Sequence, residues 1–184
     1  MTYGDEISRI DETKYNVSGT VGEDKISGKV ELKNAAEDYL NAGSYVLTFT
    51  KDENTSSNYK VQVTDGSLTV EKLAVTVIAN DVAAGYGETA PEEKWTATVS
   101  PAIKEGMAKV NYTVNPVTKT DVGTYDITIT PGTNDNYILT RENGKFTISQ
   151  KVITLTVDNA EKVYGDPDPT FTAKTNDETV KATD

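Results

Sequence analysis

The ten residues DVGTYDITIT (121–130) decide the fold class of this chain. After the glycine, the apolar residues Tyr125, Ile127 and Ile129 alternate with an aspartate and two threonines. A period of two places successive side chains on opposite faces of a strand. The stretch therefore predicts one strand of a half-buried antiparallel sheet, with its apolar side chains on the buried face.

The same element occurs a second time, 80 residues earlier. NAGSYVLTFT (41–50) places Gly43 and Tyr45 as DVGTYDITIT places Gly123 and Tyr125. Three further anchors recur at spacings of 78 to 83 residues: Tyr-Gly followed by an acid begins at residues 3, 86 and 164, Asn-Tyr occurs at 58–59 and 136–137, and GSLTV (66–70) matches GKFTI (144–148). Self-similarity at a fixed period indicates tandem repeats, of which the 184 residues hold about 2.4.

The repeat divides the chain into three modules. Module 1 spans residues 1–71 and lacks its first strand, module 2 spans residues 72–149 and is complete, and residues 150–184 form the first part of module 3. Because the chain begins and ends out of phase with the repeat, we expect it to be a segment of a longer array. The predicted strands 73–79 and 153–157 follow the preceding module with almost no linker, so the array is expected to be extended and semi-rigid.

The predicted fold class is all-β, with small antiparallel modules arranged end to end. Each module is expected to be an immunoglobulin-like sandwich or, alternatively, a β-grasp-like sheet. Alternation predicts further strands at residues 45–50, 95–99 and 110–115. Asp65-Gly66 and Asn143-Gly144 favour tight hairpin turns, because both pairs tolerate positive φ. We also expect residues 153–173 to be ordered by strand pairing, within the chain or with a neighbouring chain.

Composition excludes several kinds of site. The chain has 18 Lys and Arg against 29 Asp and Glu, a net charge of −11, and neither Cys nor His. Disulfides, thiol nucleophiles and thiolate zinc sites need Cys, and imidazole bases or Ser-His-Asp triads need His. An acidic chain also lacks the electrostatic footprint of a nucleic-acid or anionic-membrane binder. Because the acids stand in no distinctive motif, we predict no enzyme, no cofactor and no metal.

Three elements together resemble the MBG-type repeats, of the YGX kind, of bacterial cell-surface adhesins and stalk proteins. They are YGDPDPTF (164–171), DVGTY (121–125) and GKFTIS (144–149). The resemblance covers nearly the whole chain and is best in module 2, whereas module 1 has NAGSY (41–45) in place of Asp-x-Gly-x-Tyr. It implies an extracellular, wall-attached or secreted protein whose repeats act as spacers or weak adhesive modules. It implies neither catalysis nor a fixed ligand.

Two sets of residues are singled out as structural motifs. The first set consists of the Tyr-Gly pairs Tyr3, Gly4, Tyr86, Gly87, Tyr164 and Gly165. We interpret them as turns in which glycine relaxes the backbone, the alternative being a calcium site that uses Asp166 and Asp168. The second set consists of Gly43, Tyr45, Asp121, Gly123 and Tyr125. It looks like the tyrosine corner of immunoglobulin-type sandwiches, in which the Tyr hydroxyl bonds nearby backbone.

We predict a non-catalytic spacer or stalk repeat of an extracellular bacterial surface protein, at the cell surface or cell wall. The alternative is a carbohydrate- or mucin-binding module, with Trp95, Tyr59 and Tyr137 as candidate ligand residues. The alternation of Trp95 with Ala97 and Val99 favours a core position for that ring. Expected partners are host or bacterial glycans, surface proteins, or other copies of the chain through strand addition. Nucleic acid and membrane contacts are not expected.

Overall fold

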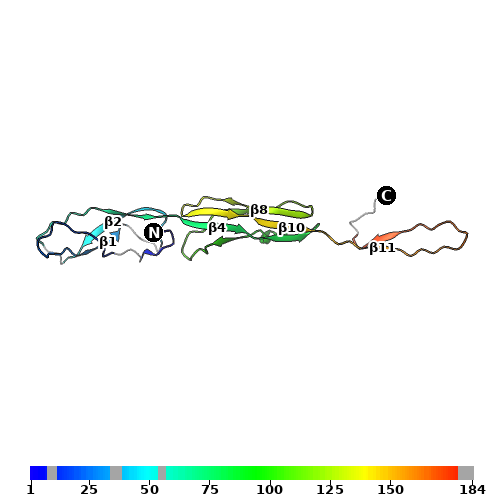
Figure 1. Ribbon diagram of the computed structural model, residues 1–184, viewed down its shortest axis with the longest axis horizontal. Coiled ribbons are helices and arrows are strands. Elements are labelled where there is room, and N and C mark those ends of the chain that lie inside the picture. The colour runs from blue at the N-terminus through cyan, green and yellow to red at the C-terminus, as the bar shows by residue number, and fades with distance from the viewer. Residues whose placement is uncertain (8–11, 34–38, 54–56, 178–184) are drawn as a thin grey trace.

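The computed structural model describes residues 1–7, 12–33, 39–53 and 57–177, and these residues are nearly all strand or loop. Figure 1 shows the modules in a row along one long axis, with module 2 between module 1 and the hairpin that contains β11. A short 3₁₀ turn, η2 (Glu92–Lys94), lies between β5 (Val82–Gly85) and β6 (Ala97–Ser100). The predicted all-β class and end-to-end arrangement are therefore confirmed. In the described part of the chain, no helix has the length and apolar character needed to cross a bilayer.

Module 2 is a sandwich of two sheets. The first sheet has the order β6-β4-β9 and the second the order β5-β10-β8-β7. Their bounds are β4 (Leu73–Ala79), β5 (Val82–Gly85), β6 (Ala97–Ser100), β7 (Tyr112–Asn115), β8 (Gly123–Pro131), β9 (Tyr137–Glu142) and β10 (Gly144–Ser149). Val77 from the first sheet packs with Ile127 and Phe146 from the second in one buried cluster. Two facing sheets correspond to the sandwich rather than to the β-grasp alternative.

Two strand pairings differ from the predicted antiparallel pattern. β4 pairs with β9 in parallel, and β10 pairs with β5 in parallel, so both sheets of module 2 are mixed. The parallel partners are far apart in sequence, since Val75 lies opposite Leu139. Alternation within one strand carries no information about the direction of a distant partner.

The two predicted hairpins are wrong. β9 and β10 are consecutive in the chain but belong to different sheets, so Asn143-Gly144 connects the two layers of the sandwich. Gly144 has no positive φ; a Cβ there would lie 2.6 Å from the carbonyl oxygen of Ala79, so the glycine allows close approach of two backbones. At Asp65-Gly66, β3 (Gly66–Val70) pairs with β2 (Gly43–Lys51), whereas residues 59–65 form no strand.

This contact gives a prediction with a matched control. We expect Gly144→Ala to lower the free energy of unfolding of module 2 by about 1–3 kcal/mol, because backbone atoms must move to admit the methyl group. Gly66, the counterpart in module 1, would place a Cβ 3.6 Å from Leu47 Cβ, an ordinary contact. Gly66→Ala should therefore change stability by less than about 0.5 kcal/mol. Urea denaturation of both variants checks the difference, and equal effects would contradict the reason given for Gly144.

Module 1 repeats the second sheet of module 2. β1 (Gly28–Leu32), β2 and β3 lie in the order β1-β2-β3. Tyr45 lies opposite Leu68 as Tyr125 lies opposite Phe146. The chain start completes the likeness, because the Tyr3 amide donates to the Glu71 carbonyl (2.8 Å) as the Tyr86 amide donates to the Ser149 carbonyl (2.9 Å). The described residues of module 1 contain no counterpart of β4.

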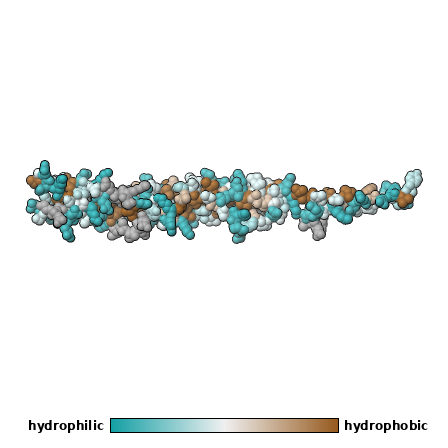
Figure 2. Space-filling view, turned by 90° about the horizontal axis from the view of Figure 1, so that it is seen from below, coloured by the Kyte–Doolittle hydropathy of each residue, from teal (hydrophilic) through white to brown (hydrophobic). Residues whose placement is uncertain are grey.

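Module 3 is represented by one hairpin. β11 (Leu155–Val157) pairs antiparallel with β12 (Ala173–Thr175), so the pairing expected for residues 153–173 is present within the chain. Leu155 lies opposite Thr175 as Val77 lies opposite Val99 in the pair β4–β6. The side chain of Val77 is fully buried, whereas that of Leu155 is 69% exposed. Figure 2 shows apolar surface along this thin end of the molecule.

Candidate functional site at the joint between modules 1 and 2

The Tyr-Gly pairs form the same turn in all three modules. Gly4, Gly87 and Gly165 have φ values of +90°, +83° and +99°, which favour glycine. In each turn the amide after the glycine donates to the carbonyl three residues earlier: Asp5 to Thr2 (3.0 Å), Glu88 to Gly85 (3.0 Å) and Asp166 to Val163 (3.2 Å). The three Tyr-Gly pairs therefore lie in hydrogen-bonded turns with a glycine of positive φ at the third position, the position where a type II turn needs one.

In module 1 this turn is docked onto module 2. The Tyr3 hydroxyl accepts a hydrogen bond of 2.7 Å from the Ala108 amide, and the Lys104 ammonium donates to the Gly4 carbonyl at 2.9 Å. Lys104 and Ala108 belong to the loop between β6 and β7. The Tyr3 ring also stands edge-on to the Tyr137 ring, with centroids 5.4 Å apart and planes at 84°. Both the backbone and the side chain of the Tyr-Gly pair therefore contact the next module.

The Asn-Tyr pair of module 2 forms the other side of the joint. Asn136 is 7% exposed, and its amide is satisfied by module 1: Oδ1 accepts from the Ala42 amide (2.9 Å) and Nδ2 donates to Asn41 Oδ1 (2.7 Å). The Tyr137 hydroxyl donates to the carbonyl of Ala108, the residue whose amide is bonded to Tyr3. A buried polar network with every partner present fixes one arrangement of its parts.

An apolar cluster surrounds these hydrogen bonds. Its buried members come from both modules: Tyr3, Leu40 and Val70 from module 1, and Val75 and Tyr137 from module 2. Neighbouring domains normally move relative to each other unless the contact between them is large and apolar. Because the cluster is continuous across the boundary, the joint holds the two modules in one orientation.

Burial raises the pKa of the Tyr137 hydroxyl to about 12, and the nearby Tyr3 adds to the shift. A tyrosine in an unfolded chain titrates near pH 10. Between these values the folded state retains a proton that the unfolded state has lost.

This shift predicts how the stability of module 2 depends on pH. The contribution of Tyr137 is complete below about pH 10 and is lost as the pH rises through 12. Urea midpoints followed by Trp95 fluorescence should fall over this range, and less steeply in Tyr137→Phe, which has no hydroxyl to titrate. An identical slope in the variant would contradict the assignment.

The counterparts of the joint residues lack these contacts. Tyr86, the counterpart of Tyr3, is 49% exposed, and Tyr164 is fully exposed. The described residues of module 3 contain no counterpart of Asn136-Tyr137 that could cover Tyr86. In module 1, the counterpart Tyr59 donates to Asp24 Oδ2 at 2.6 Å, and this carboxylate raises the pKa of the Tyr59 hydroxyl. The joint therefore needs a Tyr-Gly pair and an Asn-Tyr pair from successive modules.

The tyrosine corner is present in both modules. Tyr45 donates to the Asn41 carbonyl (2.8 Å) and Tyr125 donates to the Asp121 carbonyl (2.9 Å). Gly43 and Gly123 precede these tyrosines by two residues, with φ values of +155° and +159°. In module 1 the corner also supports the joint, because Asn41 is the residue whose side chain binds Asn136.

The structure places the three candidate ligand residues in three different surroundings. Trp95 is half-buried, with its ring 5.1 Å from the Phe146 ring in the module 2 core. Tyr137 is 4% exposed in the joint, and Tyr59 is half-buried beside a groove of module 1. For the calcium alternative, Asp168 forms an ion pair with Lys162 at 2.7 Å. Among the described residues, no three acidic side chains gather as a metal site would require.

Sequence reasoning identified the joint residues as recurring anchors but not as contacts. Tyr3 and Tyr137 belong to different anchors in different modules, so no local pattern relates them. The sequence signal that could have indicated their contact is that the Tyr-Gly pair and the Asn-Tyr pair both recur, although they stand in different parts of the repeat.

Comparison with known families gives two matches along the chain. A family model described as the MBG domain of the YGX type matches residues 1–69 and again residues 75–147. No curated protein matches the sequence.

Proposed function

The chain belongs to the MBG domain family of the YGX type, and from this premise we propose that it is a structural spacer of an extracellular bacterial surface protein. The family is a non-enzymatic repeat domain that suggests a surface-type protein. As a spacer, the chain would hold a more distal part of such a protein away from the cell surface or cell wall. Its acidic character, with a net charge of −11, favours solubility of an extended array.

The observation that carries this proposal is the joint. Bending module 1 against module 2 would break the bond from the Ala108 amide to the Tyr3 hydroxyl and the bond from Lys104 to the Gly4 carbonyl. It would also break the two bonds of the Asn136 side chain to module 1. Each net hydrogen bond contributes about 1 kcal/mol, and a buried group left without its partner costs about 1–3 kcal/mol. Bending would also expose the rings of Tyr3 and Tyr137, which are buried against each other. A repeat whose joints resist bending forms a stiff stalk.

Small-angle X-ray scattering of the chain in solution tests the spacer proposal. We expect a rod-like particle whose cross-section is that of one module and whose length does not change with ionic strength. Scattering that requires an ensemble of sharply bent particles would overturn the proposal. The described contacts that join the modules are hydrogen bonds and apolar packing, which salt screens little, so added salt should not release the modules.

A carbohydrate-binding module is the second candidate, and the groove beside Tyr59 favours it. The groove is lined by the side chains of Tyr15, Phe49 and Tyr59, and aromatic rings commonly stack on sugars. A glycan array with the unaltered chain and with Tyr59→Ala separates the candidates. Binding that the variant loses would support the second candidate, and an array without binding would support the spacer.

A further inference from the structure

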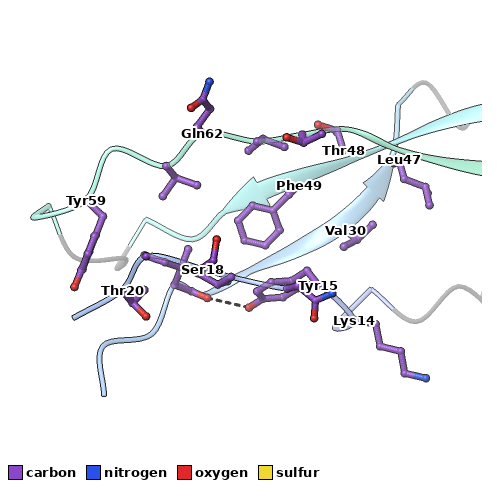
Figure 3. A pocket seen from close by; sticks show the side chains of 18 of the residues that line it. Lys14, Tyr15, Ser18, Thr20, Val30, Leu47, Thr48, Phe49, Tyr59 and Gln62 are labelled. Atoms are coloured by element: carbon purple, nitrogen blue, oxygen red, sulfur yellow. Dashed lines mark hydrogen bonds between the residues drawn. The ribbon is translucent and has the colours of Figure 1, made fainter. Parts of the chain in front are cut away.

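Module 1 contains a groove of about 680 Å³. Its two walls are residues 14–20 and residues 59–64, and its floor is the β1-β2-β3 sheet, which contributes Val30, Leu47 and Phe49. Figure 3 shows Tyr15 and Phe49 close together inside it, with Tyr59 toward one end. The floor presents Val30, Leu47 and Phe49, whereas the walls also contribute polar side chains such as Asn16 and Gln62, so the groove combines an uncovered apolar floor with partly polar walls.

Comparison with module 2 identifies what fits the groove. Residues 59–64 precede β3 as β9 precedes β10. Lys14-Tyr15 stands 80 residues before Lys94-Trp95, which lies just before β6. The Tyr15 ring lies 4.6 Å from Phe49 on β2, whereas the Trp95 ring lies 5.1 Å from Phe146 on β10, so the two rings cover neighbouring strands of matching sheets. In module 2 the strand between β6 and β9 is β4. The groove therefore lies where a counterpart of β4 would sit.

The chain carries that counterpart in module 3. KVITLTV (151–157) aligns with LAVTVIA (73–79), which contains β4, at the repeat spacing of 78. The inward side chains of β4, Val75, Val77 and Ala79, are at most 4% exposed, whereas the matching Ile153, Leu155 and Val157 are 44%, 69% and 68% exposed. β12 covers one edge of β11 through three residue pairs, and among the described residues no strand pairs with the other edge. Apolar side chains and an open strand edge of this kind favour strand addition.

We propose that residues 151–157 of one copy of the chain insert into the module 1 groove of a second copy. The register follows β4 and β9, where Val75 lies opposite Leu139 and Val77 opposite Arg141. The inserted strand runs parallel to residues 59–64, with Ile153 opposite Val61 and Leu155 opposite Val63. Residues 17–20, the counterparts of β6, take the place of β12 on its other edge. Module 2 lies between β11 and the groove of the same chain, so the donor is a different copy (Figure 1).

Such a contact is head-to-tail. An assembly of any size then has an unused strand 151–157 at one end and an empty module 1 groove at the other. The contact therefore builds open filaments rather than closed dimers. Insertion also brings Tyr86 of the donor to Tyr59 of the acceptor, as Tyr3 meets Tyr137 within one chain. This prediction goes beyond the spacer function, because a stiff chain that stays monomeric would still be a spacer.

Disulfide trapping tests the register, since the chain has no native Cys. In module 2 the hydroxyls of Thr76 and Thr140 meet at 2.9 Å on the outer face, and their counterparts are Thr154 and Gln62. A Thr154→Cys chain mixed with a Gln62→Cys chain under mild oxidation should give a mixed dimer. Paired strands lie about 4.8 Å apart, within the range of a disulfide. The control Thr156→Cys is on the same face but shifted by two residues, roughly 6.6 Å, and should cross-link at least about tenfold less.

Sedimentation velocity over a range of concentrations tests the association itself. We expect species that grow with concentration, loss of this growth in Leu155→Asp, and weaker growth in Tyr86→Ala. Tyr164→Ala is the matched control. In the repeat a Tyr-Gly turn follows the inserted strand, but the acceptor already has this turn at its own Tyr3, so the Tyr164→Ala variant should associate like the unaltered chain. A single species at all concentrations, or equal cross-linking by Thr154→Cys and Thr156→Cys, would overturn the proposal.

Discussion

Replacing Tyr137 with alanine is expected to lower the free energy of unfolding of module 2 by about 3–5 kcal/mol. The ring is 4% exposed, lies edge-on to Tyr3, and belongs to the apolar cluster shared by the two modules. Its loss leaves a cavity and removes the hydroxyl that donates to the Ala108 carbonyl. Trp95 is the single tryptophan and lies in module 2, so urea denaturation followed by its fluorescence reports on this module alone.

Tyr59→Ala is the control for this prediction. Tyr59 occupies the matching position in module 1 but faces the open groove instead of a neighbouring module. We expect the Trp95 transition of Tyr59→Ala to coincide with that of the unaltered chain. If the two alanine variants shifted this transition equally, the role assigned to Tyr137 would be wrong.

Replacing Ile127 with alanine is expected to destabilise module 2 by about 2–5 kcal/mol. Its side chain is fully buried between the two sheets, among Val77, Ile129 and Phe146. A cavity in a closely packed core costs both the lost transfer free energy and the lost contacts. Thermal unfolding followed by Trp95 fluorescence measures the effect.

The counterpart of Ile127 in module 1 is Leu47, on the floor of the groove. Because one side of Leu47 already faces open space, Leu47→Ala creates little new cavity, and we expect a cost of less than about 2 kcal/mol by circular dichroism. The measurement is made at a concentration too low for association between copies. A cost as large as that of Ile127→Ala under these conditions would mean that a segment of the same chain fills the groove in solution.

The sequence allowed the strands to be predicted because their signal is local. Tyr125, Ile127 and Ile129 in β8 alternate with polar residues over a few positions, and the hydroxyl bonds of Tyr45 and Tyr125 lie within four residues. Such features need no knowledge of the rest of the fold.

Pairing between distant segments was not predictable in this way. Asn143-Gly144 has the composition of a tight turn, yet Gly144 is required because β10 passes close to the Ala79 carbonyl, more than 60 residues away. The contact between Tyr3 and Tyr137 crosses a module boundary, so the repeat shows both residues without showing that they meet. The missing first strand of module 1 was evident from the repeat, but its consequence, a groove between residues 14–20 and 59–64, needed three-dimensional positions.

The central claim is that the Tyr3–Tyr137 joint fixes the orientation of modules 1 and 2. It is tested most directly by electron spin resonance distance measurement between labels at Ser67→Cys on β3 and Thr147→Cys on β10, both exposed. We predict one narrow distance distribution, broadened by Tyr3→Ala and unchanged by Tyr164→Ala. A broad distribution in the unaltered chain, equal to that of Tyr3→Ala, would contradict the claim.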